Sequence, residues 1–360
     1  MNIAYIADVG SQSHGVMQKV SEQTSAWAAL GHEARLFCVS PPSDPRYAPW
    51  ARYNLLNPRR AVLSDLTRFK PDMLYWREEG FSAFTLALLL MFAKRTVIEI
   101  NSSSIHEGRL FLTKSFSHKR AHYTHILSQP LVARTVLGLA CVTEELALAP
   151  EFARQPNRFV GPNGISLAGK TLMKKTDQSG PTRIVFLGSP GQPWHGVDKL
   201  PALAGALGGG FQFHLAGPRA EDISSDKSMP DNIIVHGYLD ASACGRLMAD
   251  AHIGMGTMAL HRKNMEEACP LKTREYIAAG LPVILPYRDT AFGEKTPDWI
   301  LPLPNREDAF EYTDAADAVR AFCEAQKNRI VTHEESRPYI EITSLEAKKL
   351  AAISRWLRRD

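Results

Sequence analysis

Residues 2–39 read NIAYIAD, VGSQSHG, VMQKVSEQTSAWAALG and HEARLFCV in succession, and this stretch decides the fold class. The first and last segments are apolar almost throughout, as in strands of a parallel sheet that is covered on both faces. Between them, Val16, Val20 and Trp27 recur near a 3.6-residue period, and Gly31 can end a helix. A strand, a glycine-containing turn, a helix and a strand form a βαβ unit, which predicts a doubly wound α/β domain.

The same alternation continues along the chain. Further strands are expected at DMLYW, TVIEIN and GLACVT, with an apolar helix over residues 81–92. A second series runs from TRIVFLG through FQFHLAG, NIIVHGY and HIGMGT to LPVILPY, after a stretch rich in Gly, Pro, Ser and Lys. In this series a helix is expected over residues 196–207, directly after the first strand. We therefore expect one Rossmann-like domain at residues 1–165, a linker at residues 166–182 and a second Rossmann-like domain at residues 183–342. An amphipathic C-terminal helix is expected at residues 343–360.

Length and composition exclude several classes of protein. The 360 residues are 44% hydrophobic and 22% charged, which is typical of a soluble globular protein of two domains. The most apolar run, residues 86–92, is far shorter than the ~20 residues that cross a bilayer. The N-terminus shows no export signal, so we expect a cytoplasmic location. Five scattered cysteines without paired spacing predict reduced thiols and no zinc site: Cys38, Cys141, Cys244, Cys269 and Cys323.

The positive charge is concentrated in the first half of the chain. Residues 1–165 hold 18 Lys and Arg against 13 Asp and Glu, a net +5, whereas the remainder has 24 against 25, a net −1. This excess favours an anionic acceptor or a peripheral contact with the inner face of a membrane. Solvated surface charge is the simpler alternative, because no run of four or more basic residues occurs. No nucleic-acid partner is expected.

The second half carries its chemistry in EACPLKTREYIAAGLP, residues 267–282. Glu267 lies in a loop after a predicted strand, and Pro270 suits the first turn of a helix. Ligands of open α/β sheets bind at the carboxyl ends of strands, where a helix N-terminus offers unpaired N–H groups to an anion. Lys272 lies in that first turn, and Glu275 is one turn farther, able to accept hydrogen bonds from sugar hydroxyls. These residues predict a site for a diphosphate, with a carboxylate one helical turn away.

Glu267, seven intervening residues, Glu275 and the following EYIAAGLPVI resemble the donor site of family 4 retaining glycosyltransferases, which have the GT-B fold. VGPNGISL is similar to the interdomain segment of that family, RIVFLGSPGQPWHGVDKL to its first C-domain strand and loop, and HGVMQKVSEQTSAWAALGHEARLF to its N-terminal opening. The resemblance implies two facing Rossmann-like domains across a cleft, with the acceptor on the first and the donor on the second. It also implies that Glu267 approaches the donor sugar, that Glu275 binds the ribose, and that the last helix returns to the N-terminal domain.

One departure from the family concerns the diphosphate. Where the family often places an arginine and a lysine, this chain has Ser189 and His195. We therefore expect Lys272, with Arg262 or Lys263, to stabilise the leaving group, aided by backbone N–H groups and by His195 if protonated. Solvated loop charge is the alternative for Arg262 and Lys263. The donor-binding residues expected are Glu275, Gly188, Ser189, His195, Gly196, Arg262, Lys263, Cys269, Pro270 and Leu271, with Glu267, His106 and Lys272 assigned to catalysis.

Four residues of the first domain are expected on the acceptor or phosphate side. His14 and Gly15 stand where a strand gives way to a helix, and Gly15 allows close backbone approach to a ligand. Glu99 and Asn101 lie in the last part of TVIEIN, residues 96–101, and are expected on the cleft edge of the first domain. His106 is the nearest match to a histidine that approaches the donor sugar in the resembled family. An ordinary exposed histidine is the alternative for His14.

The function expected is transfer of a sugar, with retention of configuration, from a nucleotide-diphosphate sugar to a hydroxyl acceptor in polysaccharide, glycolipid or other glycoconjugate assembly. UDP-sugars and GDP-sugars are not distinguished, the acceptor is anionic or lipid-linked, and no cofactor or metal is expected. The first turn lacks a complete G-x-G-x-x-G, which argues against a dehydrogenase. A nucleotide-sugar 2-epimerase, an inactive nucleotide-sugar-binding protein and a retaining sugar phosphorylase are the alternatives.

Overall fold

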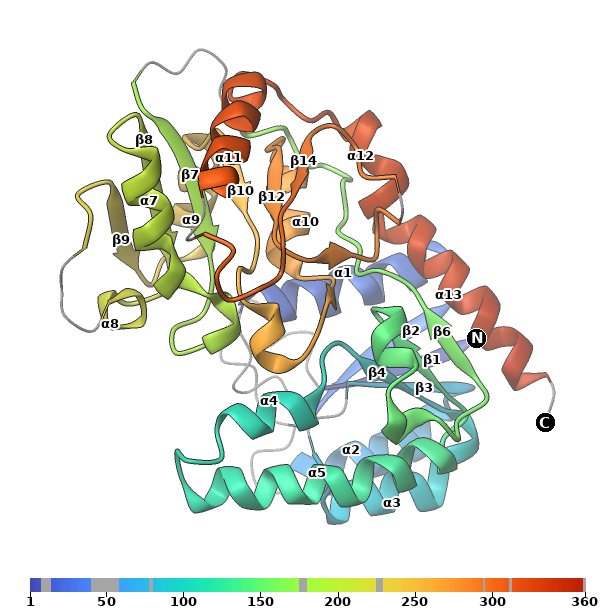
Figure 1. The fold of residues 1–360 in the computed structure, drawn as a ribbon. Coiled ribbons are helices and arrows are strands. Elements are labelled where there is room, and N and C mark those ends of the chain that lie inside the picture. Colours follow the sequence, from blue (N-terminus) through green and yellow to red (C-terminus); the bar gives the residue numbers. More distant parts are fainter. Residues whose placement is uncertain are drawn as a thin grey trace. The chain divides into compact units, whose positions relative to one another are not determined.

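The computed structural model describes residues 1–7, 14–39, 58–77, 80–174, 180–224, 229–293, 295–310 and 313–358. The chain divides into two compact units. Unit 1 comprises Met1–Ser166 and Glu341–Asp360, and unit 2 comprises Leu167–Ile340. The described strands of each unit form a six-stranded sheet whose pairs are all parallel (Figure 1). Each unit is therefore a doubly wound, Rossmann-like domain, as the sequence predicts.

The sheet of unit 1 has the order β2-β1-β3-β4-β5-β6. Its strands are β1 Asn2–Ala7, β2 Glu33–Cys38, β3 Met73–Arg77, β4 Thr96–Ile100, β5 Gly138–Cys141 and β6 Arg158–Val160. Three aromatic side chains fill the core between the sheet and the helix that follows β1. The rings of Tyr5 and Trp27 lie 5.6 Å apart, and that of Tyr75 lies 5.3 Å from Tyr5 and 5.1 Å from Trp27. Such contacts between large rings stabilise the packing beyond their buried area.

Helices cover both faces of this sheet (Figure 1). They are α1 His14–Ala29, α2 Pro58–Phe69, α3 Ala83–Phe92, α4 Ser104–Leu110, α5 Phe116–Thr135, α6 Glu144–Ala147 and α13 Ile342–Leu357, with short 3-10 helices η2 Ala93–Arg95 and η3 Pro150–Phe152. Right-handed crossovers place α1 on one face and α2, α3 and α5 on the other. The last helix, α13, packs along α1, where the Glu346 carboxylate accepts a hydrogen bond from Trp27 Nε1 over 2.7 Å.

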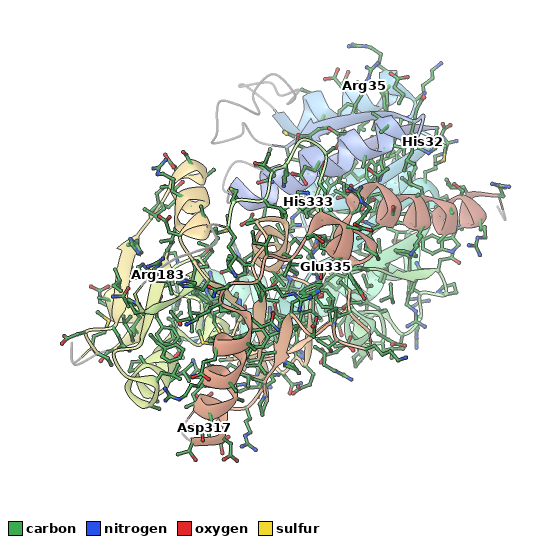
Figure 2. All side chains as sticks on the ribbon, turned by 90° about the horizontal axis from the view of Figure 1, so that it is seen from above. His32, Arg35, Arg183, Asp317, His333 and Glu335 are labelled. Carbon is green, nitrogen blue, oxygen red and sulfur yellow. The ribbon has the colours of Figure 1, made fainter. Side chains whose placement is uncertain are left out.

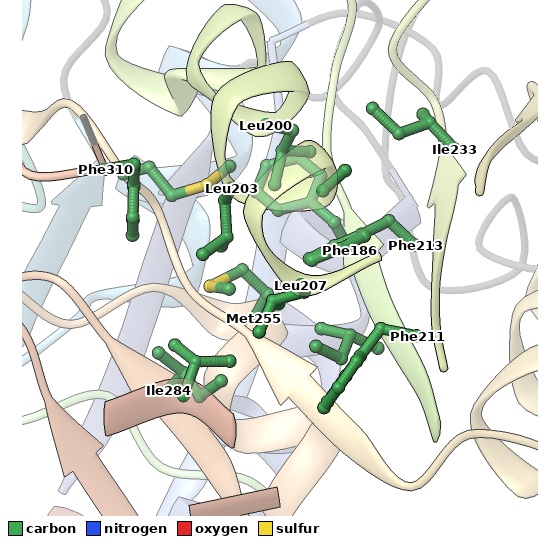
Figure 3. Close-up of a cluster of buried hydrophobic side chains, with 14 of the residues drawn as sticks. Phe186, Leu200, Leu203, Leu207, Phe211, Phe213, Ile233, Met255, Ile284 and Phe310 are labelled. Atoms are coloured by element: carbon green, nitrogen blue, oxygen red, sulfur yellow. The ribbon is translucent and has the colours of Figure 1, made fainter. Parts of the chain in front are cut away.

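The sheet of unit 2 has the order β14-β12-β10-β7-β8-β9, in which the strand order reverses between β7 and β10. Its strands are β7 Thr182–Leu187, β8 Phe211–Ala216, β9 Ile233–Gly237, β10 Ile253–Met255, β12 Val283–Leu285 and β14 Ile300–Pro302. A separate pair consists of β11 Glu267–Ala268 and β13 Arg288–Asp289. Figure 3 shows Leu203 of the helix after β7 packed with Phe186, Phe213 and Met255 of the sheet, all buried.

The helices of unit 2 are α7 Leu200–Leu207, α8 Ala220–Ile223, α9 Ala241–Ala249, α10 Leu271–Ala278, α11 Thr313–Gln326 and α12 His333–Ile340, with 3-10 helices η4 Pro193–His195, η5 Val197–Lys199 and η6 Leu260–Lys263. Figure 2 labels two side chains of α12, His333 and Glu335. His333 Nε2 donates to the Ala278 carbonyl over 2.9 Å, which ties α12 to the end of α10. Glu335 accepts from the Thr332 N–H over 2.8 Å and pairs with Arg329, which fixes the start of α12.

Two features differ from the sequence-based expectation. The helix expected over residues 196–207 is shorter, because Gly196 has a left-handed backbone and Pro201 suits the first turn of a helix that begins at Leu200. The 20-residue helix α5 was not expected, because Pro130 lies inside it and apolar residues occupy its outer as well as its inner face. Among the described residues, no helix combines the length and apolarity that a membrane span requires.

Candidate functional site

The candidate site lies at the carboxyl edge of the unit 2 sheet, where β7 adjoins β10. Ligands of doubly wound sheets bind at such a reversal of strand order. The loop after β7 and the loop after β10 are joined there: the Met258 N–H donates to the His195 carbonyl over 3.0 Å, and the Ala259 N–H to the Trp194 carbonyl over 3.2 Å. Gly196 permits this approach, because its φ is +66° and a Cβ there would lie 2.9 Å from the Ala259 nitrogen. The two loops form one fixed edge.

Lys272 places a buried amine at this edge. Its Nζ lies 3.8 Å from the ring centroid of Phe186, at the end of β7. The Nζ atom is buried and has no hydrogen-bond partner among the residues that the structure describes, although the side chain as a whole is half-buried. Burial lowers the pKa of Lys272 to about 7, against the opposing charge of Glu275. An anion arriving at this amine would restore the protonated form.

His195 also contacts Phe186, with ring centroids 5.4 Å apart. Its Nδ1 is 3.1 Å from the Ser189 carbonyl oxygen, and because a carbonyl only accepts, Nδ1 donates. Burial and the charge of Lys272 hold the pKa of His195 well below its usual value. The imidazole is therefore neutral near pH 7. It supplies no positive charge at that pH, which leaves the lysines and the backbone N–H groups to meet an anion.

Arg262 and Lys263, in η6, have different surroundings. The Arg262 guanidinium donates two hydrogen bonds to Asp198, of 2.6 and 2.8 Å, and also pairs with Glu307. Hydrogen bonds to Asp198 and Glu307 raise the pKa of Arg262 above its ordinary value. Its charge is thus balanced by two carboxylates, whereas Lys263 Nζ lies 4.7 Å from the ring centroid of Trp194 in the β7 loop. Of the two, Lys263 is the cation that faces the loop.

Glu267 lies on strand β11 rather than in the loop that the sequence suggested. Glu267 pairs with Arg288 of β13 in parallel register, and Arg288 Nη2 lies 3.4 Å from Glu267 Oε1. The Glu267 side chain is 18% exposed, whereas that of Arg288 is 77% exposed. A two-residue strand leaves no periodic signal, so sequence reasoning missed both the strand and Arg288.

Arg274 anchors this strand pair and was also missed. It is fully buried on α10, where its Nη2 donates to the Asp289 carboxylate on β13 and lies 2.8 Å from Cys269 Sγ, directly after β11. Asp289 also accepts from the Ala291 N–H over 3.1 Å. Within the described ranges, Arg274 Nε and Nη1 have no hydrogen-bond partner. A buried pair of this kind fixes the strand that presents Glu267 relative to α10.

Helix α10 is held against β7 and β10 by Tyr276. The Leu187 N–H donates to the Tyr276 hydroxyl over 2.6 Å, and the Tyr276 ring fills the space that a Cβ at Gly254 would enter, at 2.5 Å. Pro270, in extended conformation, caps α10, so the first-turn N–H groups from Leu271 onward have no side-chain cap. Glu275 lies one turn farther along α10. The pKa of the Cys244 thiol is raised mainly by burial of that thiol and, to a smaller extent, by the nearby charge of Glu275.

Gly188 follows β7 directly and meets a second glycine. A Cβ at Gly217, after β8, would lie 1.8 Å from the Gly188 carbonyl oxygen, and Gly217 has a φ of +100°. The Gly188 N–H donates to the Ala216 carbonyl over 2.9 Å. The backbone at the start of the β7 loop can therefore approach residue 217 this closely only because residue 217 is a glycine.

In unit 1, Glu99 lies in a buried cluster rather than at an open edge. Its carboxylate accepts from Lys19 Nζ over 2.6 Å, from Tyr75 Oη over 3.0 Å, and from Asn101 Nδ2 over 2.8 Å, and Arg77 lies 3.3 Å away. Burial opposes ionisation, but Lys19 and Arg77 outweigh it, and the pKa of Glu99 lies well below its usual value. Glu99 therefore contacts protein groups and holds Arg77 and Asn101 at the carboxyl end of the sheet.

His106 lies in α4, where the Ser103 hydroxyl accepts from its N–H over 3.2 Å and caps the helix. In the part of the chain that the structure describes, His106 Nδ1 is buried without a hydrogen-bond partner. Gly15 lies in the first turn of α1, and the side chain of His14 lies outside the described residues. The roles assigned to His14, Gly15 and His106 stay predictions.

No protein-family model matches the chain, and no curated protein matches it by sequence. Solved structures do match. A sucrose-phosphate synthase from Thermosynechococcus elongatus has 13% identity and a TM-score of 0.68, over 100% of both chains. A glycosyltransferase from Rickettsia africae has 12% identity and a TM-score of 0.62, over 100% of this chain and 99% of that one. An alpha-glucosyltransferase in complex with UDP-glucose and DNA has 12% identity and a TM-score of 0.66, over 98% and 99%. At such identities the likeness shows the fold, which is the GT-B fold of two Rossmann-like units.

Proposed function

We propose that the chain is a retaining glycosyltransferase of family 4, which transfers a sugar from a nucleotide-diphosphate sugar to a hydroxyl acceptor. The observation that carries the proposal is Lys272, whose buried Nζ has no hydrogen-bond partner among the described residues. It stands at the strand-order reversal of unit 2, between two glutamates at the spacing of a donor site. The alpha-glucosyltransferase structures named with UDP or UDP-glucose support a nucleotide-sugar donor.

In this proposal, the diphosphate binds at the first turn of α10, where backbone N–H groups and Lys272 meet it. Negative charge grows on the leaving diphosphate as the glycosidic bond breaks, and a preorganised cation there lowers the barrier. Lys263 is the second cation of the edge, because its Nζ lies 4.7 Å from the ring centroid of Trp194 in the β7 loop. This assignment needs no metal ion or cofactor.

Glu267 positions the donor sugar through its hydroxyls, and Glu275 accepts hydrogen bonds from the ribose. Arg288, 3.4 Å from Glu267, limits the orientations of that carboxylate. Holding the sugar in a reactive orientation reduces the entropy cost of the transition state. We propose transfer with retention of configuration, in which Glu267 orients the sugar rather than attacking it.

The acceptor side is assigned to unit 1, in a cytoplasmic protein that makes polysaccharide, glycolipid or another glycoconjugate. Asn101 and Arg77, held by Glu99 at the carboxyl end of the sheet, are the groups that meet an acceptor hydroxyl or anion. The resemblance to family 4 assigns His106 to the donor sugar. The positive balance of residues 1–165 suits an acceptor that is anionic or lipid-linked.

The test is a transfer assay with a matched pair of variants. UDP-sugars and GDP-sugars are screened by thermal shift, since a ligand of the native state raises its stability. The stabilising donor is then incubated with an acceptor panel, and NMR determines the anomeric configuration of the product. We expect Glu267→Ala to lower kcat by about 100-fold or more, because orientation is lost, whereas the neighbouring Glu266→Ala retains activity.

Each alternative gives its own outcome. Equal activity of Glu267→Ala and the wild type would contradict the role of Glu267, and an inverted product would contradict retention. A new sugar epimer formed from the donor alone would identify a 2-epimerase. Donor binding without turnover would identify a binding protein, and release of sugar phosphate a phosphorylase.

A further inference from the structure

Helix α3 of unit 1 exposes large apolar side chains. Its sequence, AFTLALLLMF, contains no charged residue, and Ser82 caps its start through the Thr85 N–H. Phe84 and Leu88 face the sheet and are buried, yet Leu86, Leu90 and Met91 are exposed, with Leu90 at 79%. A helix that is apolar on all sides is ordinarily buried on all sides. The outward half of α3 therefore has the composition of a surface that is covered.

Helix α5 exposes a second apolar stripe. Phe116, Tyr123, Leu127 and Leu131 are all exposed, with Leu127 at 78%. Their spacings of seven, four and four residues place them on one side of the helix. The opposite side is buried on the sheet, for example at Val132.

The two stripes belong to one surface. Helix α3 connects β3 to β4 and α5 connects β4 to β5, so right-handed crossovers put both helices side by side on one face of the sheet (Figure 1). Before α3, a Cβ at Gly80 would lie 4.0 Å from the His125 ring of α5. After α3, the Ala93 carbonyl accepts from the Leu137 N–H over 3.0 Å. We call this surface the α3–α5 face, made of Leu86, Leu90, Met91, Phe116, Tyr123, Leu127 and Leu131.

The charges on the α3–α5 face have one sign. Residues 83–95 and 111–135 contain no Asp or Glu, and their six cations are all exposed: Lys94, Arg95, Lys114, Lys119, Arg120 and Arg134. A second copy of the chain docked face to face would oppose cation to cation, which disfavours a symmetric dimer here. An exposed apolar patch with cations and no anions instead matches a surface that offers both acyl chains and phosphates.

We propose that the α3–α5 face docks on an anionic lipid bilayer. Both helices lie along the membrane plane, with Leu90 and Leu127 at the acyl boundary and the cations among the phosphates. The proposal goes beyond the transferase function, because it involves unit 1 alone and no residue of the donor site. Its failure would leave the proposed donor chemistry untouched.

The test is co-sedimentation with vesicles of phosphatidylcholine and of an equimolar mixture of phosphatidylcholine and phosphatidylglycerol. We expect the wild type to bind the mixed vesicles, less as salt rises, because screening weakens the contribution of the cations. Leu90→Ser with Leu127→Ser should lower the partition coefficient by about tenfold or more, since two apolar side chains no longer enter the bilayer. Leu148→Ser, at an exposed leucine outside the face, should leave it unchanged.

Circular dichroism and thermal unfolding first establish that the variants fold as the wild type does. We expect that they do, because the substituted side chains are exposed. The proposal is overturned if the wild type stays in the supernatant with both kinds of vesicle. It is also overturned if the double serine variant sediments as the wild type does. Light scattering separates one further outcome: a wild-type dimer that the double variant converts to monomers would make the face a contact between copies of the chain.

Discussion

The lowered pKa of the buried Lys272 amine predicts that binding of a nucleoside diphosphate is coupled to uptake of a proton. In the unliganded protein burial lowers its pKa to about 7, so the amine is mostly neutral above that pH. A diphosphate beside Nζ favours the charged form and raises the pKa towards the ordinary value for lysine. Between the two pKa values, binding takes up one proton, and affinity falls tenfold for each pH unit. From pH 7, where half of the unliganded amine is already neutral, to pH 9, the dissociation constant of UDP should rise by about 50-fold, or about 2.3 kcal/mol.

The assay is isothermal titration calorimetry with UDP and GDP between pH 7.5 and pH 9, where the terminal phosphate is already ionised. Repeating it in buffers of different ionisation enthalpy counts the protons taken up, and we expect nearly one at pH 8.5. Lys272→Met should bind more weakly and with no pH dependence. The matched control is Lys174→Met, because burial also lowers the pKa of Lys174 to about 7, but its Nζ is held by the carbonyl of Arg329. Uptake that persists in Lys272→Met, or a wild-type affinity that is flat over this range, would refute the reasoning.

Two further predictions concern the edge that presents the site. Arg274→Met leaves the Asp289 carboxylate buried without its partner, and should lower the free energy of unfolding in urea by about 3–5 kcal/mol. Adding Asp289→Leu should recover most of this loss. A double variant as unstable as the single variant would contradict the prediction. Gly217→Ala places a methyl group 1.8 Å from a backbone oxygen, at a residue whose backbone is left-handed, and should lower the free energy of unfolding by about 2 kcal/mol or more. Gly209→Ala, where a Cβ has no atom within 4 Å, should not lower it. Equal melting temperatures of the two variants would argue against strain at Gly217.

The fold was largely predictable from sequence because its strands are buried on both faces. The apolar runs NIAYIAD and TRIVFLG became β1 and β7, each of which ends one residue earlier than expected. Helix α5 was missed because its exposed Leu127 and Leu131 hide the 3.6-residue period. The pairing of Arg274 with Asp289 was missed for another reason. It joins residues of different elements, and a local pattern carries no information on which charges meet in the core.

The same distinction applies to the charged candidates of the site. Sequence reasoning placed Glu99 at the edge of the first domain, Arg262 in a loop and Lys272 in the first turn of a helix, but each charge depends on its partners. Glu99 holds Lys19 and Arg77, Arg262 is balanced by two carboxylates, and Lys272 lies against an aromatic ring. Desolvation and pairing come from the tertiary fold, so sequence can propose which residues are present at an edge, but not which of them carries an uncompensated charge.

Under the proposed function, one of the two cations that meet the diphosphate, Lys272, changes its charge when the ligand binds, and this has a consequence for turnover. An arginine keeps its charge in every state of the cycle and so attracts the diphosphate of donor and product alike. Lys272 is largely neutral when unliganded at pH 8 and gains its charge only with an anion beside it. Part of the binding energy of any nucleoside diphosphate is therefore spent on protonating Lys272. The product nucleotide pays this cost too and is held less tightly, and where product release limits turnover, such weaker retention raises kcat.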